Sequence, residues 1–180
     1  MDRFLKSREG PDAMLWEMMN REVYQQIGIR YLPSMHTEGP DPLNRVPSLG
    51  YQLFPTVDDI ARIVALLRKG GKHNETQLLD HDLVTRMLNP GANSGLPSGW
   101  VYREGGEARY ALGYWLIPHR GIDGCEVTIP AMVGAGGNYV IPMSNGITAF
   151  RFADRYEDNP GTYDSYHMRK ISDRIKSVCR

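Results

Sequence analysis

The chain has 180 residues, enough for one globular domain with a core and too few for two ordinary domains. Hydrophobic residues make up 41% of it and charged residues 23%, which is an ordinary globular composition. Lysine plus arginine equals aspartate plus glutamate at 21 each, and neither sign forms a long block, so the clustered positive charge that nucleic-acid binding needs is missing. No apolar run is long enough to span a bilayer, and the polar start over residues 1–11 does not have the pattern of a secretory signal. The sequence predicts no nucleic-acid partner and no membrane span, and it leaves the localisation open.

The first part of the chain, residues 1–99, is expected to be mainly helices and loops. A helix should begin near Gly10-Pro11-Asp12 and end at Gly28. A loop interrupted by prolines follows over residues 29–55. The first helix has apolar residues at helical spacing, namely Met14, Leu15, Met18, Met19, Val23 and Ile27.

Two further helices are expected before residue 99. Thr56 and Asp59 have the spacing of a capping box, and the helix that they start should end at Gly70-Gly71. Asp80 should cap a short third helix that ends before Pro90. A loop rich in glycine, proline and serine is expected over residues 90–99.

The second part, residues 100–180, is predicted to contain antiparallel strands and a C-terminal helix. Aromatic and β-branched residues favour strands over residues 110–118, 126–133, 138–143 and 147–152. Asn145-Gly146 between two apolar runs indicates a hairpin with a tight primed turn and a positive φ at Gly146. An amphipathic helix should follow over residues 165–178, with Tyr166, Met168, Ile171, Ile175 and Val178 among basic residues. The fold class is therefore α+β.

A recognisable nucleophile or metal motif is missing from the sequence. None of the nine serines has a lysine three residues on, and no serine lies in a Gly-x-Ser-x-Gly elbow. The five histidines are scattered singly, which favours surface or core roles over catalysis. Two cysteines without a nearby histidine pair do not complete a zinc site, so no metal and no cofactor are expected.

The glycine cluster Gly134-Ala135-Gly136-Gly137 lies between two expected strands. It is either a flexible hairpin or bulge, or a place where a ligand approaches backbone N–H groups that bind an anion or oxyanion. A dinucleotide fingerprint is excluded because a strand rather than a helix follows the glycines.

The segment Gly134–Pro142, followed by Asn145-Gly146 and an apolar strand, resembles the region after the third active-site motif in class C β-lactamases and related esterases. Earlier segments resemble the same family in the same order and extend the similarity from about Gly10 to Asp154. They are Ile27-Gly28-Ile29 with Thr37, Gly50–Arg62 with its threonine-x-x-aspartate helix start, Gly70-Gly71-Lys72 with Gln77-Leu78-Leu79, and Tyr110–Trp115.

This resemblance implies that the chain is the C-terminal part of a β-lactamase-like or penicillin-binding-protein-like serine hydrolase, a single incomplete domain over residues 1–180. It implies an antiparallel sheet flanked by helices, with a closing C-terminal helix. The residues that would line the acyl pocket of the parent enzyme are Ala131, Met132, Val133, Gly134, Ala135, Gly136, Gly137 and Asn138.

The sequence departs from the family at its catalytic motifs. Ser-x-x-Lys and Tyr-x-Asn are absent, and Thr-Ile-Pro-Ala-Met-Val over residues 128–133 stands where Lys-Thr-Gly is expected. We therefore expect no catalytic residue in this chain, which would be inactive alone, whereas the parent would hydrolyse a small-molecule ester or amide. The alternative is a non-catalytic binding or assembly module that retains the scaffold. The expected partner is an N-terminal half of the same enzyme or a second copy of the chain.

The two cysteines have two interpretations. Cys125 and Cys179 are either free thiols or a disulfide, and composition alone does not decide between them. In the architecture that the resemblance implies, the closing helix packs across the sheet, which would let the two residues meet. A disulfide would close a loop of about 55 residues and stabilise the fold by about 4 kcal/mol in the chain-entropy model.

Overall fold

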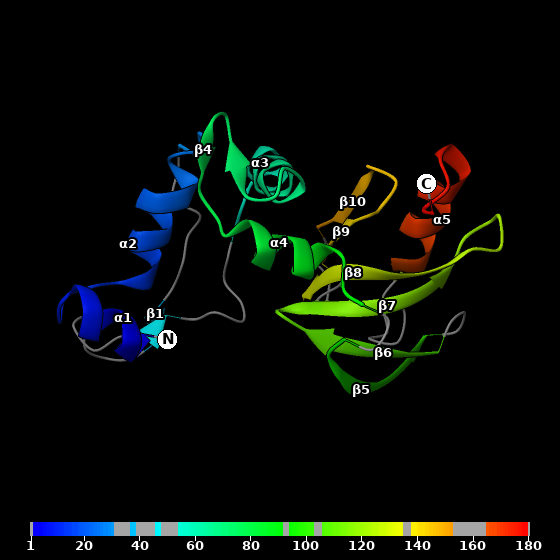
Figure 1. Cartoon of the computed structure of the whole chain (residues 1–180), viewed down its shortest axis with the longest axis horizontal. Coiled ribbons are helices and arrows are strands. Elements are labelled where there is room, and N and C mark those ends of the chain that lie inside the picture. Colours follow the sequence, from blue (N-terminus) through cyan, green and yellow to red (C-terminus); the bar gives the residue numbers. More distant parts are fainter. Residues whose placement is uncertain are drawn as a thin grey trace. The chain divides into compact units, whose positions relative to one another are not determined.

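A computed structural model describes residues 2–30, 37–38, 46–47, 54–91, 94–102, 106–134, 138–152 and 165–179. The chain forms two compact units, residues 1–81 and residues 82–180 (Figure 1). Most of the predicted loop over residues 29–55 lies outside the described residues, as do Ala135, Gly136 and Gly137 of the glycine cluster.

The first unit consists of helices and two short hairpins. The helix predicted from Gly10-Pro11-Asp12 to Gly28 is shorter than expected: an α-helical segment begins at Leu15, continues directly as a π-helix and ends at Tyr24, with residues 25–28 in a turn. A separate helix precedes it at the start of the chain. The elements are α1 (Asp2–Glu9), α2 (Leu15–Met19), the π-helix η1 (Asn20–Tyr24), β1 (Thr37–Glu38), β2 (Val46–Pro47), α3 (Val57–Arg68), β3 (Lys72–His73) and β4 (Thr76–Gln77).

The capping box predicted for α3 is confirmed. The Thr56 hydroxyl accepts a hydrogen bond from Asp59 N at 3.2 Å, and the Asp59 carboxylate accepts one from Thr56 N at 2.9 Å. These bonds pair two backbone N–H groups that a helix start otherwise leaves without partners. The apolar stripes of η1 and α3 meet in one buried cluster of Val23, Tyr24, Ile27, Ile29 and Leu66.

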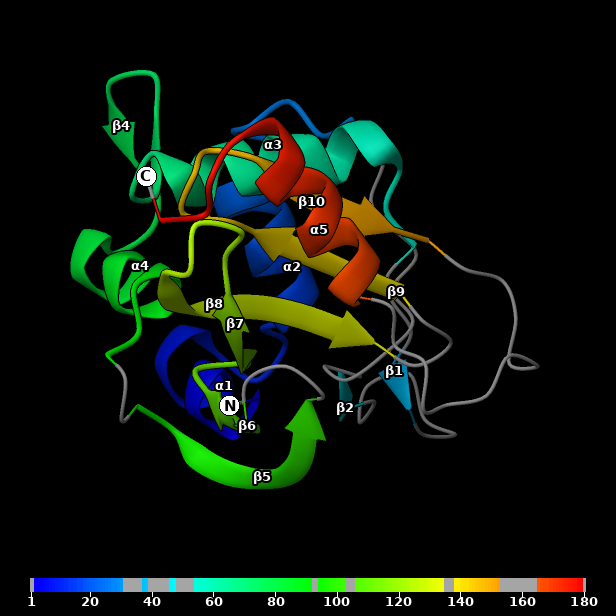
Figure 2. The same ribbon diagram turned by 90° about the vertical axis from the view of Figure 1, so that its right-hand side faces the viewer.

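The second unit contains an antiparallel meander. Helix α4 (His81–Leu88) ends just before it, and six strands then follow one another in chain order across one sheet. Figure 2 shows the last strands of the sheet with α5 beside β10. The strands are β5 (Leu96–Tyr102), β6 (Gly106–Ala111), β7 (Tyr114–Arg120), β8 (Glu126–Gly134), β9 (Asn138–Pro142) and β10 (Thr148–Arg151), and α5 covers Ser165–Ile175. The coarse α+β prediction is confirmed.

The core of this unit lies on one face of β7, β8, β9 and β10. Alternate residues of a strand point to opposite faces, and the odd-numbered residues here form the core face together with Val178, which follows α5. The buried members are Ile117, Ile129, Ala131, Tyr139, Ile141, Met143, Ala149 and Val178.

Two predictions for the start of the sheet were wrong. The expected loop at residues 90–99 contains the first residues of β5, and the expected strand at 110–118 is broken into β6 and β7. Ala111 pairs with Tyr114, so Leu112 and Gly113 form a two-residue turn with φ of 50° and 84°. Two positive φ values are the mark of a type I′ turn, which favours Asn-Gly or Gly-Gly. Leucine at the first position concealed this turn among aromatic and aliphatic neighbours.

The hairpin at Ser144-Asn145-Gly146 is confirmed, but its turn is not of the primed two-residue type. Gly146 has φ 86°, whereas Asn145 is not among the described residues with positive φ. Met143 N donates to Ile147 O at 2.9 Å and encloses a three-residue loop. Only the last loop residue is left-handed, as in the common three-residue hairpin.

The apolar residues expected on the amphipathic helix over residues 165–178 do not all face the core. Val178, which follows α5, is buried, whereas Ile171 is 56% exposed and Ile175 is 72% exposed. Among the α5 residues whose burial the structure describes, the buried ones are polar, namely Arg169, Ser172 and Asp173. These three residues are spaced by three and four positions and so share one face of the helix.

None of the helices in the described part of the chain has the length and apolar character that a bilayer crossing requires.

Replacing Gly146 with valine should lower the free energy of unfolding by about 1 kcal/mol or more, because a β-branched residue is strained at positive φ. A Cβ at this position meets no heavy atom within 4 Å, so the cost is one of backbone conformation rather than of packing. Urea denaturation measures it. Gly146→Asn is the matched control and should lose less, because asparagine tolerates the left-handed region. Equal losses for both variants would contradict the assignment.

Candidate functional site

The residues expected to line an acyl pocket lie at the end of β8 and the start of β9. Ala131 is fully buried in the core, Met132, Val133 and Asn138 are half-buried, and Gly134 is exposed. Gly134 pairs with Asn138 across the hairpin. Ala135, Gly136 and Gly137 lie outside the described residues. Since β8 alternates faces, Ala131 and Val133 lie on the core side and Met132 on the opposite side, and these consecutive residues do not share one surface.

A tyrosine stands beside this hairpin on the core face. Tyr139 pairs with Val133 on one side and with Arg151 on the other. Burial raises the pKa of the Tyr139 hydroxyl, while the hydrogen bond and the positive charge of Arg151 act in the opposite direction. A tyrosine with a raised pKa stays protonated at neutral pH, so Tyr139 is unsuited to act as a general base there.

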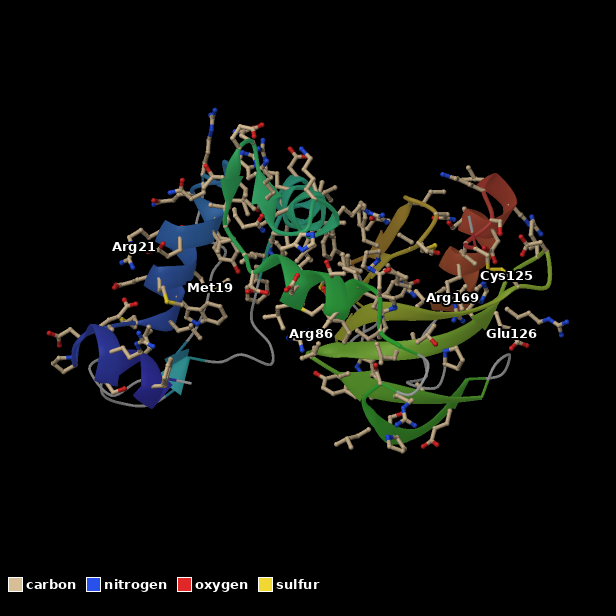
Figure 3. The ribbon with its side chains drawn as sticks, viewed as in Figure 1. Met19, Arg21, Arg86, Cys125, Glu126 and Arg169 are labelled. Carbon is tan, nitrogen blue, oxygen red and sulfur yellow. A yellow bond between two sulfur atoms is a disulfide. The ribbon has the colours of Figure 1, made fainter. Side chains whose placement is uncertain are left out.

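The largest concentration of buried polar groups lies where α5 meets the sheet. His119 on β7, Asn145 in the 144–146 turn and three α5 residues are each 4% exposed or less. Figure 3 labels Arg169 on the α5 face that is turned toward the sheet. We call His119, Asn145, Arg169, Ser172 and Asp173 the α5 polar cluster.

Asn145 connects the turn to the helix. Its Nδ2 donates to Ser172 Oγ at 2.9 Å and to Lys176 O at 2.8 Å, and its Oδ1 accepts from Ile147 N at 3.0 Å. The two donors and the acceptor of one buried amide are thus all used. Ser144 next to it donates to Val178 O. The turn therefore binds both the last turn of the helix and the residues after it.

The second connection is a buried pair between β7 and α5. His119 Nε2 lies 2.6 Å from Asp173 Oδ2, and the two side chains are 2% and 1% exposed. Asp173 Oδ1 accepts from Val178 N at 3.3 Å. His119 Nδ1 is buried and has no hydrogen-bond partner among the described residues. Substrate has no access to a pair so deeply buried, and the arrangement fits a structural connection rather than an acid–base centre.

The chain end after α5 is held by a third connection. A disulfide joins Cys125 to Cys179 with a Cα–Cα distance of 6.3 Å, within the normal range. Ser177 Oγ donates to Asp123 Oδ2 at 2.6 Å, close to the same bond. Asp123, Cys125 and Cys179 form a group of potential metal ligands whose donor atoms lie within 4.8 Å of one another, the one such group in the described part of the chain.

The polar cluster was not predicted, because the five histidines are scattered singly in the sequence and the last helix has the pattern of an amphipathic helix with an apolar face. One signal was present: Arg169, Ser172 and Asp173 recur at helical spacing. That spacing describes a polar stripe whether it faces water or protein. Only the sheet partners, His119 and Asn145, identify it as the buried side.

Comparison of the chain with protein-family models, with curated proteins and with solved structures gave no match.

Replacing Asp173 with alanine should lower the free energy of unfolding by about 3 kcal/mol or more. The loss of one partner leaves a buried imidazole and the Val178 N–H without their acceptor. The exposed pair of Lys72 and Glu75, 3.1 Å apart, provides the control, since Glu75→Ala removes an ion pair in water and should change stability little. Chemical denaturation of both variants measures the difference. A small effect of Asp173→Ala would mean that α5 does not depend on this contact.

Proposed function

We propose that this chain is the C-terminal portion of a serine hydrolase of the β-lactamase and penicillin-binding-protein type. In this proposal a preceding segment supplies the nucleophile, and the present chain supplies sheet strands and the closing helix. The parent acts on an ester or amide, and the chain alone is inactive. The observation that carries the proposal is the outward apolar face of α5.

α5 exposes a pair of isoleucines that the described residues do not cover. Ile171 and Ile175 are one helical turn apart and are both mostly exposed, while the polar side of the helix is buried. A single exposed isoleucine is common on protein surfaces and needs no explanation. Two exposed isoleucines one turn apart, on a helix that buries polar side chains, suggest that a further segment packs against them. In the proposed parent, α5 lies between the sheet and the N-terminal segment, which covers these isoleucines.

The edge of the sheet supports the same proposal. In the described strands β10 is the last in order, with β9 on its inner side. Phe150 is half-buried in this strand and Phe152 just beyond it is 44% exposed. Strand edges with apolar side chains invite pairing with a further strand. The N-terminal strands of the proposed parent would continue the sheet from β10.

The alternative is a non-catalytic binding or assembly module that retains the scaffold. The absence of Ser-x-x-Lys from the sequence favours it for this polypeptide taken by itself. It needs no further segment to contribute a nucleophile. The two proposals differ in what must lie upstream of Met1 in the DNA.

The purified chain should not hydrolyse nitrocefin or p-nitrophenyl esters above the buffer rate, because acyl transfer needs an activated nucleophile. Any in-frame DNA upstream of Met1 should encode Ser-x-x-Lys, and the longer product should react with a fluorophosphonate probe at that serine. Saturable turnover by the present chain that is lost on mutating one of its own serines would defeat the claim of inactivity. Upstream DNA without an in-frame Ser-x-x-Lys would defeat the claim of parentage and leave the binding module.

The chain by itself should associate at micromolar concentration through the uncovered α5 face. Light scattering should give a mass above the 20.4 kDa of one chain. The double variant Ile171→Glu, Ile175→Glu should shift it to the monomer, because charged side chains oppose burial of that face. Ile122→Glu is the matched control, since Ile122 is 68% exposed in the turn between β7 and β8. A wild-type chain that is monomeric and binds no hydrophobic dye would contradict the prediction.

A further inference from the structure

We propose that Cys125, Cys179 and Asp123 form a binding site for a thiophilic divalent cation, of which zinc is the fitting example, when the disulfide is reduced. The disulfide and the metal are alternative ways of joining the β7–β8 turn to the residues after α5. The proposal rests on the geometry of these three residues and is independent of the hydrolase assignment.

The three side chains already have a compact arrangement. Their donor atoms lie within 4.8 Å of one another. Thiolates on a tetrahedral zinc ion, with bonds of about 2.3 Å, lie about 3.8 Å apart. Separation of the two sulfurs after reduction and a shift of about 1 Å by the carboxylate would satisfy that geometry. Three protein ligands leave a fourth position for water.

The cysteine of the β7–β8 turn is fixed independently of the disulfide. Gly121 N donates to Cys125 O at 2.8 Å, and Gly124 N donates to Gly121 O at 3.0 Å. A Cβ at Gly121 would lie 2.8 Å from Cys125 Sγ, so only glycine allows the backbone to approach this sulfur so closely. Reduction breaks none of these contacts. The turn therefore continues to present the thiol of Cys125 on the same side.

The cysteine after α5 is fixed as well. Val178, its neighbour, is fully buried in the core, and its backbone is bound by Ser144 and Asp173. Cys179 N donates to Ser177 Oγ at 3.2 Å. Two thiols that stay close without their covalent bond form a preorganised pair, and the entropy cost of bringing metal ligands together is reduced.

Asp123 is oriented between the two cysteines. Its Oδ1 accepts from Cys125 N at 3.4 Å and its Oδ2 accepts from Ser177 Oγ at 2.6 Å. The carboxylate thus contacts both segments that carry the cysteines. Asp123 and Cys179 are exposed and Cys125 is half-buried, so an ion reaches the site from solvent without opening the core. The carboxylate is a hard ligand and the thiolates are soft ligands, a mixture that zinc accepts.

The chemistry balances without a further component. A low-molecular-weight thiol or a phosphine reductant donates two electrons to the disulfide, two protons complete the two thiols, and the reductant leaves in its oxidised form. The metal then displaces one proton from each thiol to solvent, because thiolates are the binding form. Oxidation of the thiols releases the metal, so metal and disulfide exclude each other.

Cobalt titration of the full chain tests the site, because cobalt in zinc positions gives a thiolate charge-transfer band. The chain has two cysteines, so the band and a free-thiol count report on these two sulfurs alone. The reduced protein should bind one cobalt per chain with this band, zinc should displace it, and the disulfide form should give none. Zinc should also slow re-oxidation of the thiols by oxidised glutathione. Two free thiols without the band would overturn the proposal.

Two carboxylate variants separate the site from nonspecific binding. Asp123→Asn keeps an oxygen for the Cys125 N–H but is a poor ligand, and it should weaken cobalt binding at least about tenfold, the loss that even an outer-shell change causes. Glu126→Gln, beside Cys125, should leave the affinity unchanged. Figure 3 labels Cys125 and Glu126. Equal affinities of the two variants would exclude Asp123 as a ligand. Circular dichroism establishes that each variant is folded. Ser177→Ala removes the hydrogen bond to the Asp123 carboxylate but no metal ligand, so this variant should keep the band.

Discussion

The hydrogen bond between His119 Nε2 and Asp173 joins β7 to α5 across 54 residues of chain, and the position of the closing helix depends on it. Around this pair, Asn145 donates to Ser172 in the last turn of the helix and to Lys176 just after it, and the disulfide fixes the residues that follow. Each connection starts from a different part of the sheet: a strand, a hairpin turn and the turn between β7 and β8. Together they hold the polar side of α5 inward and leave Ile171 and Ile175 facing out.

A polar inner face is an uncommon way to attach a helix. Burial of charged and hydrogen-bonding groups has a desolvation cost that well-made contacts offset only in part, so an apolar face would give a similar or higher stability. Polar contacts, however, need one geometry, whereas an apolar face tolerates several. The α5 polar cluster therefore specifies the rotation of the helix about its axis, and that rotation determines which side chains remain available to a further segment.

Much of the secondary structure was predictable because it depends on local signals. The capping box at Thr56, the apolar spacing of the early helix residues and the positive φ at Gly146 follow from neighbouring residues alone. The errors have two origins. Leu112 stands where a type I′ turn favours asparagine or glycine, so the Leu112-Gly113 turn was hidden inside a run typical of a strand. The rotation of α5, in contrast, depends on His119 and Asn145, which are far away in the chain. No local pattern reports such partners.

The residues expected to line the acyl pocket, Ala131–Asn138, show the same limit of prediction from local sequence. A run of consecutive residues carries the family resemblance, but a strand distributes consecutive side chains over two faces, and Ala131 belongs to the core. The group of potential metal ligands, Asp123, Cys125 and Cys179, was not predicted for a related reason, because Cys179 is distant in the sequence and only the fold brings it to the β7–β8 turn.

A double-mutant cycle on His119 and Asp173 tests most directly whether the polar face of α5 attaches it to the sheet. The free energies of unfolding of His119→Gln, Asp173→Asn and the double variant are compared with wild type under conditions that keep the disulfide intact. The account predicts a coupling energy of about 1 kcal/mol or more, as for residues in contact. A coupling energy near zero would mean that the two side chains do not meet, and the inward polar face of α5 would be contradicted.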